Sequence, residues 1–352
     1  AALLILQDSY REKQIWGVAI LGVLTVGTVV CSGNSTFILY LIMILAAKEV
    51  NVRTIVKLTC IIQGAMLLSI VVMSQIGIIP DYIFDASTRQ RHGLGFLWTT
   101  TGAILYFYFM VLYIYLREER AHLIEYVILE AVNFGLYKLT DARMSFYLST
   151  LLLVYVYVMR FYWQNRKDRI RKNRLLIGAP AFFCILAVAC QIFYIPTDAR
   201  WQKINSVLSG RLELGCFGWR DYGFSLLGTK IEWIGFSHNA TAGAYNYVDC
   251  SYMQILLENG LIPLVIIIAV YTYIMYMAVK EKDFYLQTAV LLITAFSITE
   301  PRLLNLAYNP LPFFGITYIS LRGRSALFHR EDHRLNRRVR FRTTHVRLKA
   351  RK

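Results

Sequence analysis

Charged side chains are scarce in this sequence. Only 17% of its 352 residues are Asp, Glu, Lys or Arg, while 57% are hydrophobic and 14% are aromatic. A soluble globular domain carries about 25% charged residues, so this composition excludes that class. We therefore expect a polytopic integral membrane protein.

Motifs for nucleotide or metal chemistry are also missing. The segment from Gly223 to Lys230 has Thr and Lys in the wrong order for a Walker A loop. The sequence has no Asp-x-Asp motif of the kind that holds a metal-bound sugar nucleotide, and no cluster of His, Cys and carboxylates with metal-ligand spacing. We expect an activity that needs no metal ion, no nucleotide and no cofactor.

The six cysteines are scattered and form no Cys-x-x-Cys pair. Four lie in apolar runs, where a buried thiol is the simplest interpretation. Cys216 and Cys250 share one long polar segment and could form a disulfide if that segment is outside the cytoplasm. No spacing rule supports this pair.

Long apolar runs dominate what is present. A helix of about 20 residues crosses a ~30 Å hydrocarbon core, and ten runs approach this length: 16–31, 35–47, 55–79, 96–116, 122–139, 144–163, 175–195, 253–279, 284–300 and 308–321. The sequence predicts an all-α fold with about ten transmembrane helices, in which residues 1–321 form the membrane domain. The chain begins without methionine or a signal-peptide pattern, so further spans could precede it.

Basic residues are distributed unevenly between the two sides of this predicted bundle. When the N-terminus is placed inside, 28 of the 38 Lys and Arg fall on the inner side, as the positive-inside rule favours. The longest connection, residues 196–252, is then extracytoplasmic. Residues 322–352 hold twelve Lys and Arg and predict a basic cytoplasmic tail attracted to anionic membrane lipid, with no nucleic acid as partner.

The outer side keeps ten basic residues, and seven of them are Arg. The planar guanidinium group pairs bidentately with phosphate. Arg89 and Arg91 lie in one outer loop, Arg143 in the next and Arg211 in the long loop. These four predict a diphosphate-binding site, while the alternative is that each only reaches lipid headgroups.

The outer side also carries two candidate catalytic carboxylates. Asp249 precedes a short apolar helix, expected at the membrane surface, that Gly260 and Pro263 terminate. Glu300 ends a later span. Either could accept a proton from a hydroxyl nucleophile, although Asp at a helix start is most commonly an N-cap. The long loop adds aromatic side chains suited to stacking on sugar rings: Trp219, Tyr247 and Tyr252.

The run at 122–139 is the most polar of the ten, since it holds Glu125 and Glu130. Ionisable groups at membrane depth mark substrate or ion pathways. A transporter, such as a flippase for lipid-linked sugars, is therefore an alternative function. No internal repeat of hydropathy supports it.

Four outer motifs resemble those of a known family. Arg91-His-Gly-Leu-Gly95-Phe, followed by Gly102, is similar to a pattern of Arg, ten residues and Gly that enters a span. Asp141-Ala-Arg143-Met-Ser145-Phe resembles a Ser-Arg-Thr/Ser turn, and Leu208-Ser-Gly-Arg211-Leu resembles a Gly-Arg element that opens a large outer loop. Tyr247-Val-Asp249-Cys-Ser-Tyr252, continued to Gly260, is similar to the closing element of that loop.

Together these motifs resemble the Wzy-type polysaccharide polymerases of the O-antigen polymerase and ligase group. The chain departs from the pattern in two places. Ligases carry His-Asn where this chain has Asp249-Cys250, which favours a polymerase over a ligase, and Leu97-Trp98-Thr99 replaces a frequent His-Pro-Asn.

The resemblance implies a GT-C-like membrane glycosyltransferase in the cytoplasmic membrane of a bacterium. Such an enzyme joins oligosaccharide repeat units carried on undecaprenyl diphosphate into a capsule, O-antigen or exopolysaccharide. Its implied partners are the lipid-linked oligosaccharide, membrane lipid, a flippase and a chain-length regulator. Arg89, Arg91, Arg143 and Arg211 would then hold diphosphate, and Asp249 or Glu300 would act on the acceptor hydroxyl.

The predicted topology can be tested with reporter fusions. Because most basic residues lie on the opposite side of the membrane, we expect an extracytoplasmic reporter to be active when fused at Gly228. A cytoplasmic reporter should be active at Asn165. Cytoplasmic activity at Gly228 would reverse the orientation.

Overall fold

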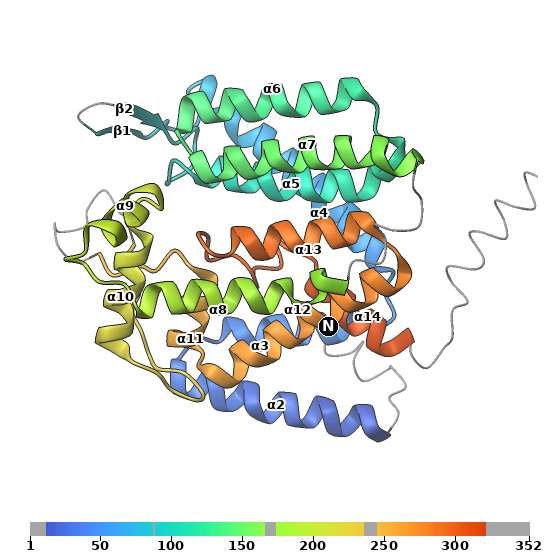
Figure 1. The fold of residues 1–352 in the computed structure, drawn as a ribbon, viewed down its shortest axis with the longest axis vertical. Coiled ribbons are helices and arrows are strands. Elements are labelled where there is room, and N and C mark those ends of the chain that lie inside the picture. The colour runs from blue at the N-terminus through green and yellow to red at the C-terminus, as the bar shows by residue number, and fades with distance from the viewer. Residues whose placement is uncertain (1–11, 87–88, 166–173, 236–244, 322–352) are drawn as a thin grey trace, which may run out of the picture.

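The computed structural model describes residues 12–86, 89–165, 174–235 and 245–321 (Figure 1). The chain is mostly helical, with 72% helix and 2% strand. Its elements are α2 (Glu12–Ser32), α3 (Thr36–Ala46), α4 (Val52–Gln75), β1 (Ile83–Ala86), β2 (Arg89–His92), α5 (Thr101–Arg117), η1 (Glu118–Arg120), α6 (Leu123–Thr140), α7 (Arg143–Asn165), η3 (Arg174–Gly178), α8 (Ala179–Ile192), α9 (Ala199–Val207), α10 (Arg211–Tyr222), α11 (Ser251–Glu258), α12 (Leu261–Glu281), α13 (Phe284–Phe296) and α14 (Pro312–Leu321).

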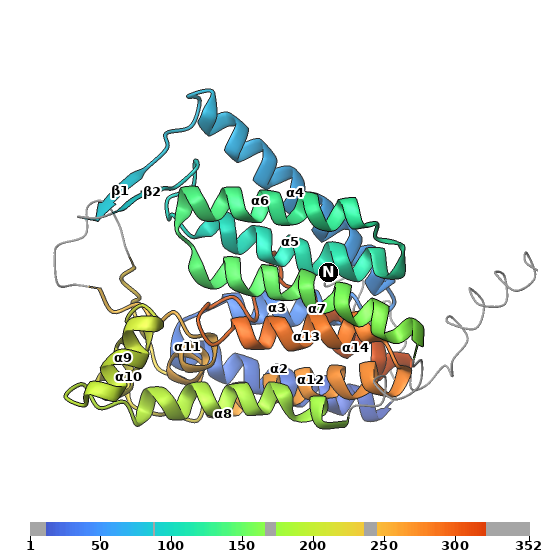
Figure 2. The same cartoon turned by 45° about the horizontal axis from the view of Figure 1, so that its top comes forward.

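The long helices run lengthwise through one bundle. The β1–β2 hairpin, α9, α10 and α11 all lie at the same end of it (Figures 1 and 2). We call this the loop end. The opposite end carries the connections from α3 to α4, from α5 to α6 and from α12 to α13, so most helices cross from one end to the other.

Helix α5 forms the centre of the bundle. Its sequence is apolar on all sides, as expected for a helix enclosed by others, and Phe107, Tyr108, Met110 and Leu112 are fully buried. The rings of Phe107 and Phe296 lie 4.3 Å apart and join α5 to α13. This packing holds the ends of both helices in fixed positions at the loop end.

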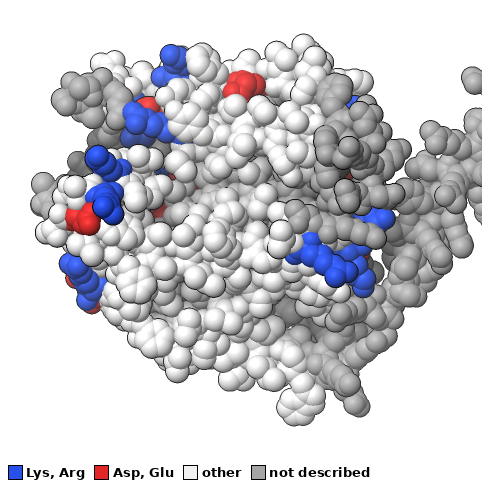
Figure 3. All heavy atoms as spheres, viewed as in Figure 1, with Lys and Arg blue, Asp and Glu red and all other residues white. Residues whose placement is uncertain are grey.

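Among the described residues, four helices are long and apolar enough to cross a membrane: Ile15–Ser32, Val52–Gln75, Arg174–Ile192 and Leu261–Glu281. They expose large apolar side chains, such as Val30 at 78% and Leu68 at 67%, a surface that suits lipid. Figure 3 shows Lys and Arg gathered towards the two ends, with a broad and almost uncharged surface between them. Helices α3 and α13 are apolar but shorter, and the ten-span topology stays a prediction.

Two local predictions need correction. The chain is not all helix, because the outer loop that holds Arg89 and Arg91 contains the antiparallel β1–β2 hairpin, in which Phe84 pairs with Arg91. The run expected as one span at 253–279 is divided between α11 and α12, and the expected end of the short helix at Gly260 is confirmed. Six of the eight residues of α11 are buried, and its position at the membrane surface stays a prediction.

A close backbone contact fixes the break between α11 and α12. Gly260 has a φ of +96°, and the first two amides of α12 donate hydrogen bonds to the carbonyls of residues 225–226. A Cβ atom on Gly260 would lie 2.5 Å from the backbone nitrogen of Gly228, and one on Gly228 would lie 2.2 Å from the carbonyl oxygen of Glu258. Only glycine fits at these two positions, so this contact ties the long loop to the start of α12.

The loop at 196–252 is therefore largely structured, with α9 and α10 in its first half. Cys216 and Cys250 are both buried and free, so they form no disulfide. The predicted basic tail at 322–352 lies outside the described residues.

Replacing Gly260 with Ala should destabilise the protein by roughly 2 kcal/mol or more, because it adds backbone strain to a steric clash. The melting temperature of the purified protein in detergent measures this. Gly22→Ala is the matched control, since nothing lies within 4 Å of its added Cβ and Ala favours a helix over Gly. Equal melting of the Gly260 variant and the wild type would contradict the tight contact.

Candidate functional site

A tight turn between α9 and α10 positions Arg211. Ser209 and Gly210 both have positive φ values, of 56° and 84°, so the chain reverses direction just before the helix begins. The side-chain oxygen of Asn205 then accepts hydrogen bonds from the backbone N–H groups of residues 212 and 213, at 3.1 and 3.3 Å. The turn and this cap fix the first residue of α10, and its side chain points across to another segment.

Arg211 joins α10 to the segment that follows α13. Its Nε donates to the carbonyl oxygen of Thr299 at 2.8 Å, and one terminal nitrogen lies 3.3 Å from the Glu300 carboxylate. The Asp249 carboxylate lies 3.7 Å from Arg211 Nε. One guanidinium therefore lies between the two carboxylates predicted as catalytic, which come from separate parts of the chain.

The two carboxylates differ in burial. The side chain of Glu300 is 8% exposed and that of Asp249 is 26% exposed. Burial raises the pKa of Glu300 to about 7; Arg211 opposes this shift and the negative charge of Asp249 adds to it. Burial also raises the pKa of Asp249, while Arg211 and Arg302 lower it. The pKa of Glu300 thus lies near neutral pH, and Asp249 is the more exposed of the two carboxylates.

The start of α11 is held by Ser251 and not by an Asp249 cap. Ser251 Oγ donates to the carbonyl oxygen of Glu300 at 2.5 Å and accepts from the backbone N–H of Leu303 at 3.1 Å. The N-cap position is Cys250, which makes no side-chain cap hydrogen bond. Asp249 is therefore not the helix cap that its position suggested, because it faces Arg211 instead.

Arg302 is a second cation beside these carboxylates, and its charge lowers the pKa of both. Its guanidinium lies over the ring of Tyr308, 4.3 Å from the centroid. Its buried Nε has no hydrogen-bond partner among the described residues. Arg302 is one of the seven arginines predicted on the outer side. Its position two residues after Glu300 is the one signal in the sequence that could have assigned it to the site.

The other predicted arginines form a second group at the loop end. Arg91 Nε donates to the carbonyl oxygen of Thr140 at 3.0 Å, and Arg143 pairs with Asp141 at 3.4 Å with half of its side chain exposed. Both side chains therefore lie at the turn between α6 and α7. Arg89 lies in β2, and its side chain is outside the described part of the structure. The predicted four-arginine site is thus divided into a group around Arg211 and a group around this turn.

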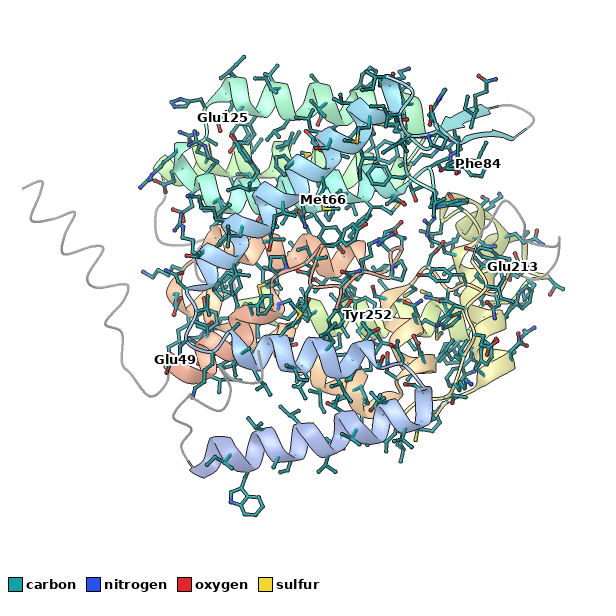
Figure 4. The ribbon with its side chains drawn as sticks, turned by 180° about the vertical axis from the view of Figure 1, so that it is seen from behind. Glu49, Met66, Phe84, Glu125, Glu213 and Tyr252 are labelled. Carbon is teal, nitrogen blue, oxygen red and sulfur yellow. The ribbon has the colours of Figure 1, made fainter. Side chains whose placement is uncertain are left out.

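The predicted sugar-stacking aromatics differ in their surroundings. The prediction that Tyr252 stacks on sugar rings is wrong. Tyr252 is fully buried within the bundle, and its hydroxyl donates to the carbonyl oxygen of Thr294 at 2.7 Å (Figure 4). Trp219 is half-buried against the core. Tyr247 is also half-buried, and its ring packs edge-on against Trp233 at 6.0 Å.

Tyr245 is an aromatic residue that sequence reasoning did not select. Its side chain is 41% exposed. Partial burial raises its pKa, and the nearby charge of Asp249 adds to the shift. An exposed ring beside the reachable carboxylate is better placed than Tyr252 to contact a sugar.

The polar residues of α6 have structural partners. Glu125 lies at the opposite end of the bundle (Figure 4) and pairs with Arg117 at 2.6 Å. Glu130 accepts a hydrogen bond from Thr150 at 2.7 Å and another from Asn133 at 3.2 Å. These contacts join α6 to α5 and α7, which weakens the argument for a pathway through α6.

The pKa of Glu300 makes stability depend on pH. The ordinary value is 4.5 and the folded value about 7, so between these values the folded protein keeps a proton that the unfolded chain has lost. Stability should therefore fall as the pH rises from 5 to 8, by roughly 3 kcal/mol for a shift of this size. Comparing melting temperatures of the wild type and Glu300→Gln across this range isolates the effect. Parallel curves would contradict the raised pKa.

The arrangement combines two cations with one reachable and one buried carboxylate at the end of an apolar bundle. Such a set can bind an anionic group and accept a proton from a hydroxyl beside it. No family model, no curated protein and no solved structure matches the chain.

Proposed function

We propose that this chain is a membrane glycosyltransferase that polymerises oligosaccharide repeat units carried on undecaprenyl diphosphate. A hydroxyl of the acceptor unit attacks the anomeric carbon of the donor chain, and the bond from that carbon to the diphosphate oxygen breaks. The hydroxyl proton passes to a carboxylate, and undecaprenyl diphosphate leaves. The observation that supports this best is the placement of Arg211 between Asp249 and Glu300, with Arg302 beside them.

The leaving diphosphate needs fixed positive charge as its own charge develops. Arg211 is anchored by the Thr299 carbonyl and so presents a fixed guanidinium. Arg302 adds a second positive charge at the same place, since it lowers the pKa of both carboxylates. These two arginines are our candidates for the donor diphosphate.

Asp249 is our candidate for the base. It is the more exposed of the two carboxylates, so an acceptor hydroxyl can approach it. Glu300 is almost enclosed and hydrogen-bonded to Arg211, a position suited to orienting the guanidinium. Asp249 would touch the substrate, and Glu300 would act through Arg211.

Polymerisation involves two lipid-linked substrates, and each carries a diphosphate. The chain has two separate arginine groups at the loop end. Arg91 and Arg143 at the α6–α7 turn, with Arg89 on the same strand as Arg91, are our candidates for the acceptor diphosphate. This assignment gives the second group a role distinct from that of Arg211.

The proposal places the chain in the cytoplasmic membrane of a bacterium, with about ten GT-C-like spans and the loop end outside. A flippase and a chain-length regulator would be its functional partners. A ligase that transfers a finished glycan would use the same donor chemistry with another acceptor. A proton-coupled transporter is the second candidate, because a buried carboxyl with a pKa of about 7 next to arginines also suits a proton-linked step.

Arg211→Ala should abolish polymer formation in cells without changing the amount of protein. Arg211→Lys should restore little, because a point charge does not replace a planar fork on a diphosphate. Polymer length on gels measures this, with immunoblotting of the membrane fraction for protein level. Arg220→Ala is the matched control, since Arg220 is an exposed residue of the same helix. Normal polymer from Arg211→Ala would remove Arg211 from the reaction.

A further inference from the structure

A polar cavity lies next to the Arg211 cluster, on the other side of Ser251. Its volume is about 150 Å³, and its walls come from the α2–α3 turn, the start of α3, α11 and residues 301–305. A water molecule occupies ~30 Å³ in the liquid, so the cavity accommodates a ring-sized group. The α2–α3 turn, Ser32-Gly-Asn-Ser35, gave no chemical signal in the sequence.

Glu258 is the acidic group of this cavity, and it is held in a fixed orientation. Asn34 donates to one carboxylate oxygen at 2.9 Å, and the indole nitrogen of Trp233 donates to the other at 3.2 Å. Each carboxylate oxygen can accept a further hydrogen bond. The cavity therefore presents oriented acceptors to a ligand.

Asn259 is a further polar residue in the wall of the cavity. It is only 5% exposed, and its side-chain NH₂ group is buried without a hydrogen-bond acceptor among the described residues. Because this nitrogen is closed to solvent, a ligand in the cavity would meet it only after the side chain rotates.

The walls exclude several kinds of ligand. As far as the structure describes it, the cavity lining contains no Lys or Arg and one carboxylate, so a phosphate would be repelled. That carboxylate already has two donors, and one acidic group is a poor site for a metal ion. The polar side chains of Gln254, Glu258 and Asn305 in the walls are poorly suited to a lipid tail. A neutral group with several hydroxyls satisfies both donors and acceptors, and the walls of Phe37 and Tyr40 would pack against its apolar faces.

The cavity is connected to the reacting groups by short structural links. Ser251 and Pro301 line it, and Ser251 Oγ is bonded to the carbonyl oxygen of Glu300. Gln254 lines it as well, and it hydrogen-bonds Tyr247. Pro301 directly follows Glu300, and Ser251 comes two residues after Asp249. A sugar in the cavity would thus contact the two segments that carry these carboxylates.

We infer that this cavity binds a single neutral sugar ring, and that this ring belongs to the acceptor repeat unit. The inference rests on the proposed function for the identity of the acceptor, but sugar binding itself does not. Glu258 would bind the ring hydroxyls, and Gln254 would align the sugar with Asp249.

Saturation-transfer NMR on the full chain in lipid nanodiscs tests this directly. The probes are free methyl glycosides of glucose, galactose, rhamnose and N-acetylglucosamine. At least one should bind the wild type, and Gln254→Leu and Glu258→Gln should each weaken it roughly tenfold through the loss of a polar contact. Glu232→Gln is the matched control, since Glu232 is an exposed acid of the loop before α11 and does not line the cavity, and it should bind as the wild type does.

Asp249→Asn separates the two proposals, because Asp249 does not line the cavity, so this variant should bind the sugar normally while forming no polymer. Failure of all four glycosides to bind the wild type, or equal binding by the wild type and Gln254→Leu, would overturn the sugar site. Glu258→Gln keeps the shape of the side chain, so its melting temperature identifies any loss that comes from unfolding. Sugar binding with no polymer from the wild type would leave the site standing and reject the polymerase.

Discussion

The contact of Arg211 with Thr299 and Glu300 is the interaction on which the site depends. It joins the start of α10 to the segment after α13. Thr299 and Glu300 come 88 and 89 residues after Arg211 in the sequence. Burying a carboxylate and a guanidinium is expensive, and such a pair seldom adds net stability. Because burial raises the pKa of Glu300 to about 7, the pair is poorly explained as a stabilising device. Perturbed carboxylates of this kind concentrate at functional sites.

Several other contacts at the loop end hold the segments of Arg211 and Glu300 in place. The Ser209–Gly210 turn and the Asn205 cap set the start of α10. Ser251 ties the start of α11 to the same segment that Arg211 reaches. The facing glycines at 228 and 260 bring the loop against the α11–α12 break. Two of these are backbone features and two are side-chain hydrogen bonds to the backbone, so the site is built on fixed elements although most of its residues lie in connections.

Sequence reasoning located the helices well, because apolar runs have a clear length and the turns between them are polar. It also selected Arg211, Asp249 and Glu300, since charged residues next to predicted spans are few. It could not show that one guanidinium lies between both carboxylates, because this depends on how α10 packs against the end of α13. It misplaced Tyr252, since a Tyr in a loop-proximal helix can face either side and only packing decides. Sequence reasoning also could not predict the cavity at Glu258, because its walls come from three separate segments, 34–40, 251–259 and 301–305, that share no local pattern.

The central claim is that the loop end transfers a glycan from one diphosphate-linked lipid to another. Purified protein in vesicles, supplied with an undecaprenyl-diphosphate-linked repeat unit, allows the released lipid and the lengthened glycan to be counted by mass spectrometry. The account predicts one undecaprenyl diphosphate released for each new glycosidic bond, and none with Asp249→Asn. Movement of the intact lipid-linked unit across the bilayer, with no released diphosphate, would contradict it.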